Sequence, residues 1–173
     1  MKQLLSETQI QTRIAALASD INADYRGRPL TVVGTLMGSL MFLADLVRRL
    51  DGPLQWRLVR ASSYRGAATT PGELQIDDSH LSDLTGRDVL LLDDILDTGQ
   101  TLAALVERLQ QHQPRSLRTA VLLWKRDRQL VPIEPDYHGF LIPDLFVVGY
   151  GLDHQEDYRH LPYVAHLEPQ DLD

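Results

Sequence analysis

The chain has 173 residues, no cysteine and a formal net charge of −7, because 24 acidic residues outnumber 17 basic ones. This length is typical of one α/β domain, so we expect residues 1–173 to form a single domain. The lack of cysteine excludes disulfides, thiolate zinc sites and a cysteine nucleophile, and fits a reducing compartment such as the cytoplasm. The acidic balance argues against nucleic-acid binding, which requires Lys and Arg to neutralise phosphates.

The sequence also gives no sign of a membrane segment. No run approaches the roughly 18 apolar residues of a membrane span, and the first segment, MKQLLSETQIQ, lacks the long apolar core of a signal peptide. We therefore expect a soluble, unprocessed protein with no membrane partner.

The first predicted element is a helix over residues 7–25. Ser6 and Gln9 have the spacing of a capping box, and apolar residues follow at helical intervals. A short apolar strand is predicted over 30–33. It ends in the segment GTLMGS, which leads into a second amphipathic helix over about 40–50. This strand, glycine turn and helix could be a plain structural connection or part of a site.

A turn at residues 51–53 precedes a strand in which apolar and polar residues alternate over 56–59. Residues 62–73 are small and polar and contain Gly and Pro. Such a composition predicts a mobile hairpin tip or lid, with a simple surface loop as the alternative.

The central stretch of the chain is DVLLLDDILDTGQTL. Residues 89–92 are continuously apolar and bounded by charge, which is typical of a strand buried on both faces of a parallel sheet. Asp93 and Asp94 follow at the expected end of this strand, and Asp97 comes one short turn later. Residues 98–101 then lead into an amphipathic helix.

This stretch has the groups needed to bind a phosphorylated sugar. Backbone N–H groups at a helix start, the hydroxyls of Thr98 and Thr101, and the close backbone approach allowed by Gly99 predict an anion site. Asp93 and Asp94 can accept hydrogen bonds from sugar hydroxyls, or they can bind Mg²⁺, which favours one or two carboxylates together with substrate phosphates.

Two other interpretations of this stretch are open. A strand ending in acids also occurs in phosphate-loop ATPases, but their G-x-x-x-x-G-K-[ST] motif is absent from the sequence. The acids could otherwise only cap a helix and solvate a loop, which is the ordinary role of a single aspartate. Three carboxylates beside a Thr-Gly pair favour a site.

The rest of the chain continues the alternation of strands and helices. A strand is predicted over 117–124, ending in Lys125, and short strands are predicted around Phe140 and Val147. The tail adds a glycine-hinged acidic loop and a last short β segment. The whole pattern predicts an α/β fold with a doubly wound, mostly parallel twisted sheet, in which ligands bind at the carboxyl ends of the strands.

The segment DDILDTGQT resembles the phosphoribosyl pyrophosphate (PRPP) signature of the type I phosphoribosyltransferases. Nearly the whole chain is similar to the hypoxanthine-guanine branch of that family, through VVGTLMGSLMFLADLVR, ASSYRG, residues 122–125 and GFLIPDLFVVGYGLDHQEDYRHLPY. The resemblance implies the fold of that family, with a small hood formed by the N- and C-terminal segments. It also implies a Mg²⁺-dependent purine salvage enzyme that forms IMP or GMP and pyrophosphate, as a homodimer or homotetramer.

The resemblance assigns a role to each matching residue. The PRPP ribose and 5′-phosphate would be bound by Asp93, Asp94, Asp97, Thr98, Gly99, Gln100 and Thr101. Asp97 would also accept the purine proton, which makes it the catalytic residue. The ligands of Mg²⁺ would be Asp93, Asp94 and Asp153.

The other substrate groups have their own sets of residues. Pyrophosphate would be bound by Leu36, Met37, Gly38 and Arg159. The 6-oxopurine would be bound by Lys125, Phe146, Val147 and Asp153, with Lys125 at the exocyclic oxygen and Phe146 stacked on the base. Ser63 and Tyr64 would belong to the closing lid.

The chain departs from the pattern of the family at two positions. Asp93 stands where Glu is more usual, and Met37 stands where the family generally has Lys or Arg. The family also places a non-proline cis peptide in this turn, which would fall between Leu36 and Met37. Two rival functions remain open: a xanthine-preferring enzyme of the same class, and a PRPP-sensing regulator, which would not need the residues on the purine side.

Overall fold

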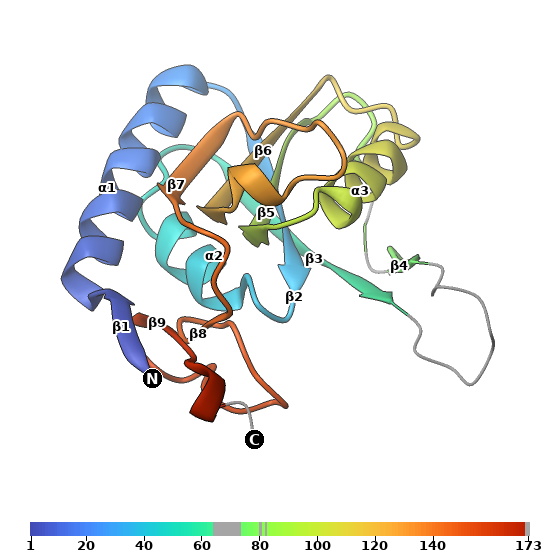
Figure 1. Ribbon diagram of the computed structural model, residues 1–173. Helices are drawn as coiled ribbons and strands as arrows, with labels where there is room; N and C mark the ends of the chain where they lie inside the picture. The colour runs from blue at the N-terminus through green and yellow to red at the C-terminus, as the bar shows by residue number, and fades with distance from the viewer. Residues whose placement is uncertain (64–73, 80, 82, 172–173) are drawn as a thin grey trace.

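The structure is a computed structural model that describes residues 1–63, 74–79, 81 and 83–171 (Figure 1). Its helices are α1 (Glu7–Asp24), α2 (Leu40–Val47), α3 (Gln100–Gln110) and the 3₁₀ turns η1 (Arg126–Arg128) and η2 (Pro169–Asp171). Its strands are β1 (Lys2–Leu5), β2 (Leu30–Leu36), β3 (Leu54–Ser63), β4 (Leu74–Asp77), β5 (Asp88–Leu96), β6 (Ser116–Trp124), β7 (Tyr137–Leu141), β8 (Val147–Val148) and β9 (Val164–His166).

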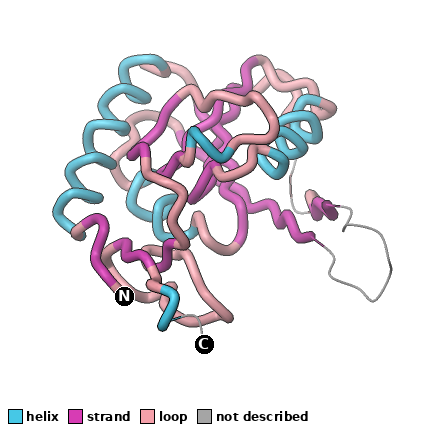
Figure 2. Tube along the Cα trace, in the orientation of Figure 1, coloured by secondary structure: helices cyan, strands magenta, loops and turns pink. Residues whose placement is uncertain are grey.

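The main sheet has six strands in the order β4-β3-β2-β5-β6-β7. Only β4 runs antiparallel to its neighbour, and the other five strands are parallel. The prediction of a mostly parallel α/β sheet is therefore confirmed. Figures 1 and 2 show α1 and α2 on one side of this sheet and α3 on the other.

The two faces of the sheet form two separate cores, because successive side chains of a strand point to opposite faces. Leu90 and Leu92 of β5 pack with apolar residues of α1 and α2. Val89 and Leu91 point the other way and pack with the apolar side of α3. All four are fully buried, as the continuous apolar run 89–92 predicted.

A second, smaller sheet covers one end of the molecule. Its strand order is β1-β9-β8, with antiparallel pairing that joins the N-terminal segment to the C-terminal segment. This sheet is the predicted hood. Figure 1 shows it near the end of the main sheet to which β2 points.

Several element bounds differ from the predicted ones. The strand predicted over 30–33 continues to Leu36, because its parallel pairing with β3 extends to that residue. The helix predicted to reach residue 50 ends at Val47, where Arg49 N and Leu50 N bond instead to carbonyls three residues back. The strand β1 and the edge strand β4 were not predicted.

The prediction that β5 stops before Asp93 was wrong. The strand continues to Leu96, because Ile95 and Leu96 pair in parallel with residues of β6. Asp93 and Asp94, which we call the acidic pair, therefore lie inside a strand, and the sheet holds the backbone around them.

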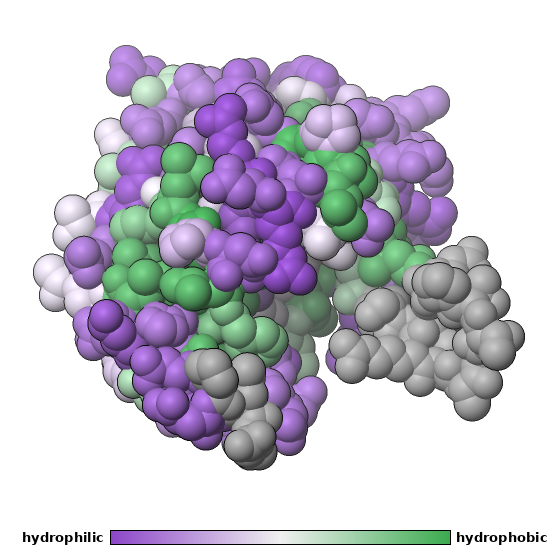
Figure 3. All heavy atoms as spheres, viewed as in Figure 1, coloured by the Kyte–Doolittle hydropathy of each residue, from purple (hydrophilic) through white to green (hydrophobic). Residues whose placement is uncertain are grey.

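The surface agrees with the composition of the chain. Hydrophilic side chains cover the upper edge of the face shown in Figure 3, and apolar side chains gather beside the lower part of α1 and α2. No helix in the described part of the chain is long and apolar enough to cross a membrane.

Candidate functional site

A pocket of about 330 Å³ lies where β2 and β5 end, facing the hood. It brings together these residues from the predicted sites: Leu36, Met37, Gly38, Asp93, Asp94, Asp97, Thr98, Gly99, Thr101, Asp153 and Arg159. They come from three separate parts of the chain. The convergence follows from the parallel sheet, in which the carboxyl ends of neighbouring strands share one edge.

The floor of the pocket is the acidic pair. The Asp93 side chain is almost fully buried and accepts a hydrogen bond from Thr35 Oγ1, and the backbone N–H of Asp94 donates to it at 3.1 Å. Burial and the adjacent negative charge of Asp94 raise the pKa of Asp93 well above its ordinary value. Burial also raises the pKa of Asp94. Two carboxylates that resist ionisation together favour a cation between them.

The raised pKa of Asp93 predicts how the stability of the ligand-free protein depends on pH. An acid with a raised pKa favours folding below its ordinary value of 3.8, and this contribution is lost as the pH rises through the raised value. At high pH the buried carboxyl must ionise beside a second carboxyl, which costs folding free energy. Asp93→Asn should therefore raise the melting temperature more at about pH 8 than at about pH 4.

Thermal unfolding of the wild type and the variant at both pH values measures this difference. Asp127→Asn is the control, because Asp127 lies on the exposed turn η1. An equal shift in melting temperature at the two pH values would show that the burial of Asp93 is not a cost to folding.

The turn after β2 packs directly against the acidic pair. A Cβ added at Gly38 would lie 1.6 Å from Asp94 Oδ2, and a Cβ added at Gly151 would lie 2.0 Å from the carbonyl oxygen of Gly38. Only glycine fits at both positions. The peptide between Leu36 and Met37 is cis, as the resemblance implied, and the side chain of Met37 is exposed.

The loop after β5 opens into α3, whose N-cap is Gly99. This glycine has a φ of +86°, in the left-handed region that other residues rarely adopt, and a Cβ there would lie 2.7 Å from the carbonyl oxygen of Val131. The Thr98 carbonyl accepts the N–H groups of Leu130 and Val131, at 2.9 and 3.1 Å. The loop is thus anchored from behind, while the first N–H groups of α3 lack partners within the helix.

The opposite wall comes from the loop between β8 and β9. Arg159 Nη2 lies 2.8 Å from Asp153 Oδ1, and Nη1 donates to the carbonyl of Gly151 at 2.8 Å. The positive charge of Arg159 opposes the rise in the pKa of Asp94. Four non-glycine residues of this loop have positive φ, namely Tyr150, Gln155, Glu156 and Tyr158. A backbone held in this conformation is common where a loop positions functional groups.

Lys125 lies just beyond β6 and is 5% exposed. Its Nζ is 3.4 Å from Asp97 Oδ2 and 3.6 Å from Asp144 Oδ1. Arg128 is close to the same two acids, with Nε 2.9 Å from Asp97 Oδ1 and Nη1 2.7 Å from Asp144 Oδ1. The structure therefore places Lys125 beside Asp97.

The remaining predicted residues do not line the pocket itself. Phe146 is 47% exposed and meets His154 edge to face, with 5.3 Å between ring centroids, and Val147 is buried in the hood sheet. Gln100 is exposed at the start of α3. Ser63 is the last residue of β3, and Tyr64 lies outside the described residues, as does the rest of the predicted lid.

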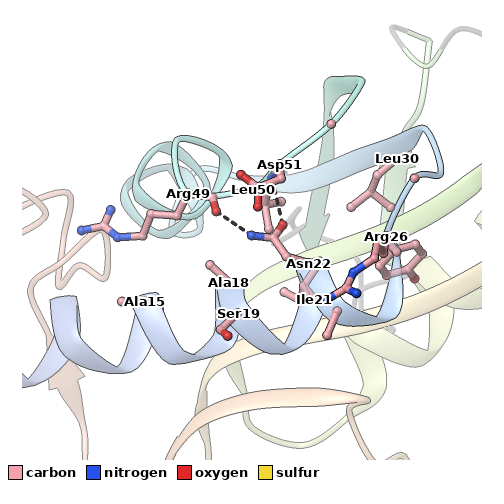
Figure 4. Close-up of a pocket in the computed structure, with 14 residues that line it drawn as sticks. Ala15, Ala18, Ser19, Ile21, Asn22, Arg26, Leu30, Arg49, Leu50 and Asp51 are labelled. Atoms are coloured by element: carbon pink, nitrogen blue, oxygen red, sulfur yellow. Dashed lines mark hydrogen bonds between the residues drawn. The ribbon is translucent and has the colours of Figure 1, made fainter.

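A larger cavity, of about 510 Å³, lies elsewhere, between α1 and the turn after α2 (Figure 4). It borders Leu30, the first residue of β2, so it is at the amino ends of the strands. Asn22 donates to the Arg49 carbonyl at 3.0 Å and accepts from the Asp51 N–H at 2.9 Å. Because these polar groups bond to one another, this cavity is a weaker candidate.

Sequence reasoning missed four residues that shape the site. Thr35 holds Asp93, Gly151 meets the Gly38 carbonyl, and Arg128 and Asp144 meet Asp97 and Lys125. The glycine had a signal, since it belongs to a Gly-Tyr-Gly run. The other three carry no periodic pattern, because their partners are distant in sequence.

The chain is similar to a known protein family and to known proteins over most of its length. The family model described as the phosphoribosyl transferase domain matches residues 1–155. A hypoxanthine-guanine phosphoribosyltransferase of Staphylococcus aureus is 44% identical over 167 residues, which cover 96% of this chain and 93% of the relative.

Two solved structures are also similar to the chain. A hypoxanthine phosphoribosyltransferase of Staphylococcus aureus has a TM-score of 0.91 and 44% identity, covering 98% of this chain and 92% of its own. A ternary substrates complex of the Trypanosoma cruzi hypoxanthine phosphoribosyltransferase, in a substituted form, has a TM-score of 0.92 and 37% identity, covering 99% and 97%.

Proposed function

This chain belongs to the type I phosphoribosyltransferases, in their hypoxanthine-guanine branch, and we propose that it transfers the 5-phosphoribosyl group from PRPP to hypoxanthine or guanine. The products are IMP or GMP and pyrophosphate, which makes it an enzyme of purine salvage. The observation that carries the proposal is the pocket in which the acidic pair, the loop before α3, the cis turn and Arg159 converge.

The PRPP end of the site would use groups of β5 and α3. The N–H groups at the start of α3, with Thr98 and Thr101, suit the 5′-phosphate, because a helix start favours anions. Asp93, oriented by Thr35, and Asp94 would accept the ribose hydroxyls. Arg159 and the backbone around Met37 would bind the pyrophosphate.

The acidic pair also fits Mg²⁺. Two adjacent carboxylates with raised pKa values gain a counter-charge when a cation binds, and Mg²⁺ prefers few protein ligands plus substrate oxygens. Asp93, Asp94 and Asp153 would contribute to its binding, with substrate oxygens completing the coordination, since no group of three or more His, Asp or Glu side chains in the described residues is arranged to hold a metal ion. Bound Mg²⁺ supplies charge neutralisation of the leaving pyrophosphate.

The purine side would use four groups. Lys125 is a donor only, so it matches the 6-oxo oxygen of hypoxanthine and guanine. Asp97 would take the proton of the purine ring nitrogen that attacks the anomeric carbon. Phe146, half exposed, would offer a ring face to the base, and the backbone of Val147 would read its edge.

Compartment and assembly are part of the proposal. The lack of cysteine supports the cytoplasm. A homodimer or homotetramer is supported by Met37, Leu40 and Met41, which are large apolar residues exposed close together in the chain.

Metal removal tests the proposal. The purified chain with PRPP and hypoxanthine should form IMP and pyrophosphate when Mg²⁺ is present, lose this activity with a chelator, and regain it when Mg²⁺ is restored. Initial rates of IMP formation measure each step. Turnover that persists in metal-free buffer would contradict the role of the acidic pair as a metal site.

A further inference from the structure

Four charged side chains form a closed ring beside the pocket, on the proposed purine side. Asp97 is within 3.4 Å of Lys125 and 2.9 Å of Arg128, and Asp144 is within 3.6 Å of Lys125 and 2.7 Å of Arg128. Asp97 follows β5, Lys125 follows β6, Arg128 ends η1 and Asp144 follows β7. Each cation touches both acids, so the ring is neutral and each member depends on two others.

The ring has an inner and an outer half. The side chain of Lys125 is 6% exposed and that of Asp97 is 35% exposed, whereas Arg128 and Asp144 are 47% and 54% exposed. An ion pair this exposed adds little to folding stability. What the Arg128–Asp144 pair can affect is the position of the two inner groups.

Arg128 lies close to Asp97 but donates no hydrogen bond to its Oδ1 atom. Asp97 Oδ1 is buried and accepts no hydrogen bond from the part of the chain that the structure describes, although Arg128 Nε is 2.9 Å away. The Nε–H bond is therefore not aligned on this oxygen. Arg128 therefore fixes the place of the carboxylate by its charge, while the lone pairs of Oδ1 stay free to accept a hydrogen bond from a purine N–H group.

Asp144 is a second carboxylate beside the ammonium group of Lys125. Asp97 Oδ2 and Asp144 Oδ1 lie 3.4 and 3.6 Å from Lys125 Nζ, so a carboxylate that serves the purine proton leaves Asp144 as the other partner of the ammonium group. Asp144 is then the carboxylate that still holds the ammonium group at the crevice. Arg128 in turn fixes Asp144 with the shortest contact of the ring.

From this geometry we propose that Arg128 and Asp144 are positioning residues for the transfer reaction, Arg128 for the Asp97 carboxylate and Asp144 for the Lys125 ammonium group. The inference rests on the proposed function. It predicts a division of kinetic effects, because one residue acts through the proton acceptor and the other through the group that binds the purine.

The test compares the variants Arg128→Gln and Asp144→Asn with two matched control variants, Arg126→Gln and Asp127→Asn. Both control residues lie on η1, the 3₁₀ turn that also carries Arg128. Arg126 is a suitable control because its side chain is 63% exposed and its ion pair is with Glu134, at 3.6 Å. Both controls should stay within about twofold of the wild type in all kinetic constants, and all four variants should keep melting temperatures within about 2 °C.

Arg128→Gln should lower kcat about 10-fold and leave the KM for PRPP unchanged, whereas Asp144→Asn should raise the KM for hypoxanthine about 5-fold. Asp144→Glu keeps the charge and should recover most of the loss. In the double variant the effects should be less than multiplicative, because the two residues share one ring.

The outcomes separate the two proposals. Suppose that the wild-type chain is active and that Arg128→Gln and Asp144→Asn have the same kinetic constants as their controls. This result would overturn the inference about Arg128 and Asp144 and leave the proposed function standing. The same holds if Asp144→Glu behaves like Asp144→Asn, since charge would then not be what matters. A wild-type chain that transfers nothing would overturn the proposed function, and this inference with it.

Discussion

Asp97→Asn is expected to lower kcat with hypoxanthine by roughly 10²- to 10⁴-fold, which is the usual contribution of a general base. The carboxylate lines the pocket, lies 3.4 Å from Lys125 and keeps a buried oxygen free of hydrogen bonds from the described residues. An amide of the same shape cannot take the proton. Steady-state kinetics with hypoxanthine and PRPP each varied measure the effect.

The KM for PRPP separates this role from a role in phosphate binding. If Asp97 is the proton acceptor, the KM for PRPP should change little in the variant. An unchanged kcat with a raised KM for PRPP would make Asp97 part of the phosphate loop and would assign the proton to solvent. Asp127→Asn, which removes an exposed carboxylate from η1, serves as the control.

Lys125→Met is expected to lower kcat/KM for hypoxanthine by about 1.5 to 3 kcal/mol, the worth of a hydrogen bond to a charged group. The lysine is 5% exposed, and among the described residues only Asp97 and Asp144 form ion pairs with it. Methionine keeps most of the length and apolar stem of the side chain but cannot donate. The gap between hypoxanthine and adenine should therefore narrow.

The selectivity of the variant distinguishes two origins of substrate choice. Lys125 opposes the amino group of adenine with a donor, so its removal should help adenine relative to the 6-oxopurines. A variant that keeps the full preference for 6-oxopurines would show that backbone groups near Val147 set the choice. Arg126→Met removes a neighbouring cation without altering the pocket wall and is the matched control.

The parts of the fold that could be predicted from the sequence are those with local signals. The capping box predicted at Ser6 is present, with Ser6 N–H donating to Gln9 Oε1 at 2.8 Å and Gln9 N–H to Ser6 Oγ at 3.3 Å. The apolar run 89–92 became a fully buried central strand. Both patterns are contained within a few residues, so no long-range information was needed.

The parts that could not be predicted depend on contacts between distant segments. Strand β1 forms because Lys2–Leu5 pairs with Val164–His166. The local sequence of these four residues does not predict this long-range pairing. Strand β5 continues through the acidic pair because β6 lies beside it. Likewise, Arg128 and Asp144 looked like ordinary surface charges until the fold brought them to Asp97 and Lys125.

For the site, the resemblance assigned residues that the fold has brought together, but their roles stay predictions. Most of the residues assigned to PRPP and pyrophosphate line one pocket. The purine-side residues Lys125, Phe146 and Val147 lie outside that lining, so their roles depend on kinetic tests. Tyr64 lies outside the described residues.

The measurement that tests the central claim most directly is a base panel: initial rates of the wild-type chain with PRPP, Mg²⁺ and hypoxanthine, guanine, xanthine or adenine in turn. A site built around a donor to a 6-oxo group should reject adenine by up to about 10⁴- to 10⁵-fold in kcat/KM. We expect efficient turnover of hypoxanthine or guanine and almost none of adenine. Equal turnover of adenine, or no nucleotide from any of the four bases, would contradict the account.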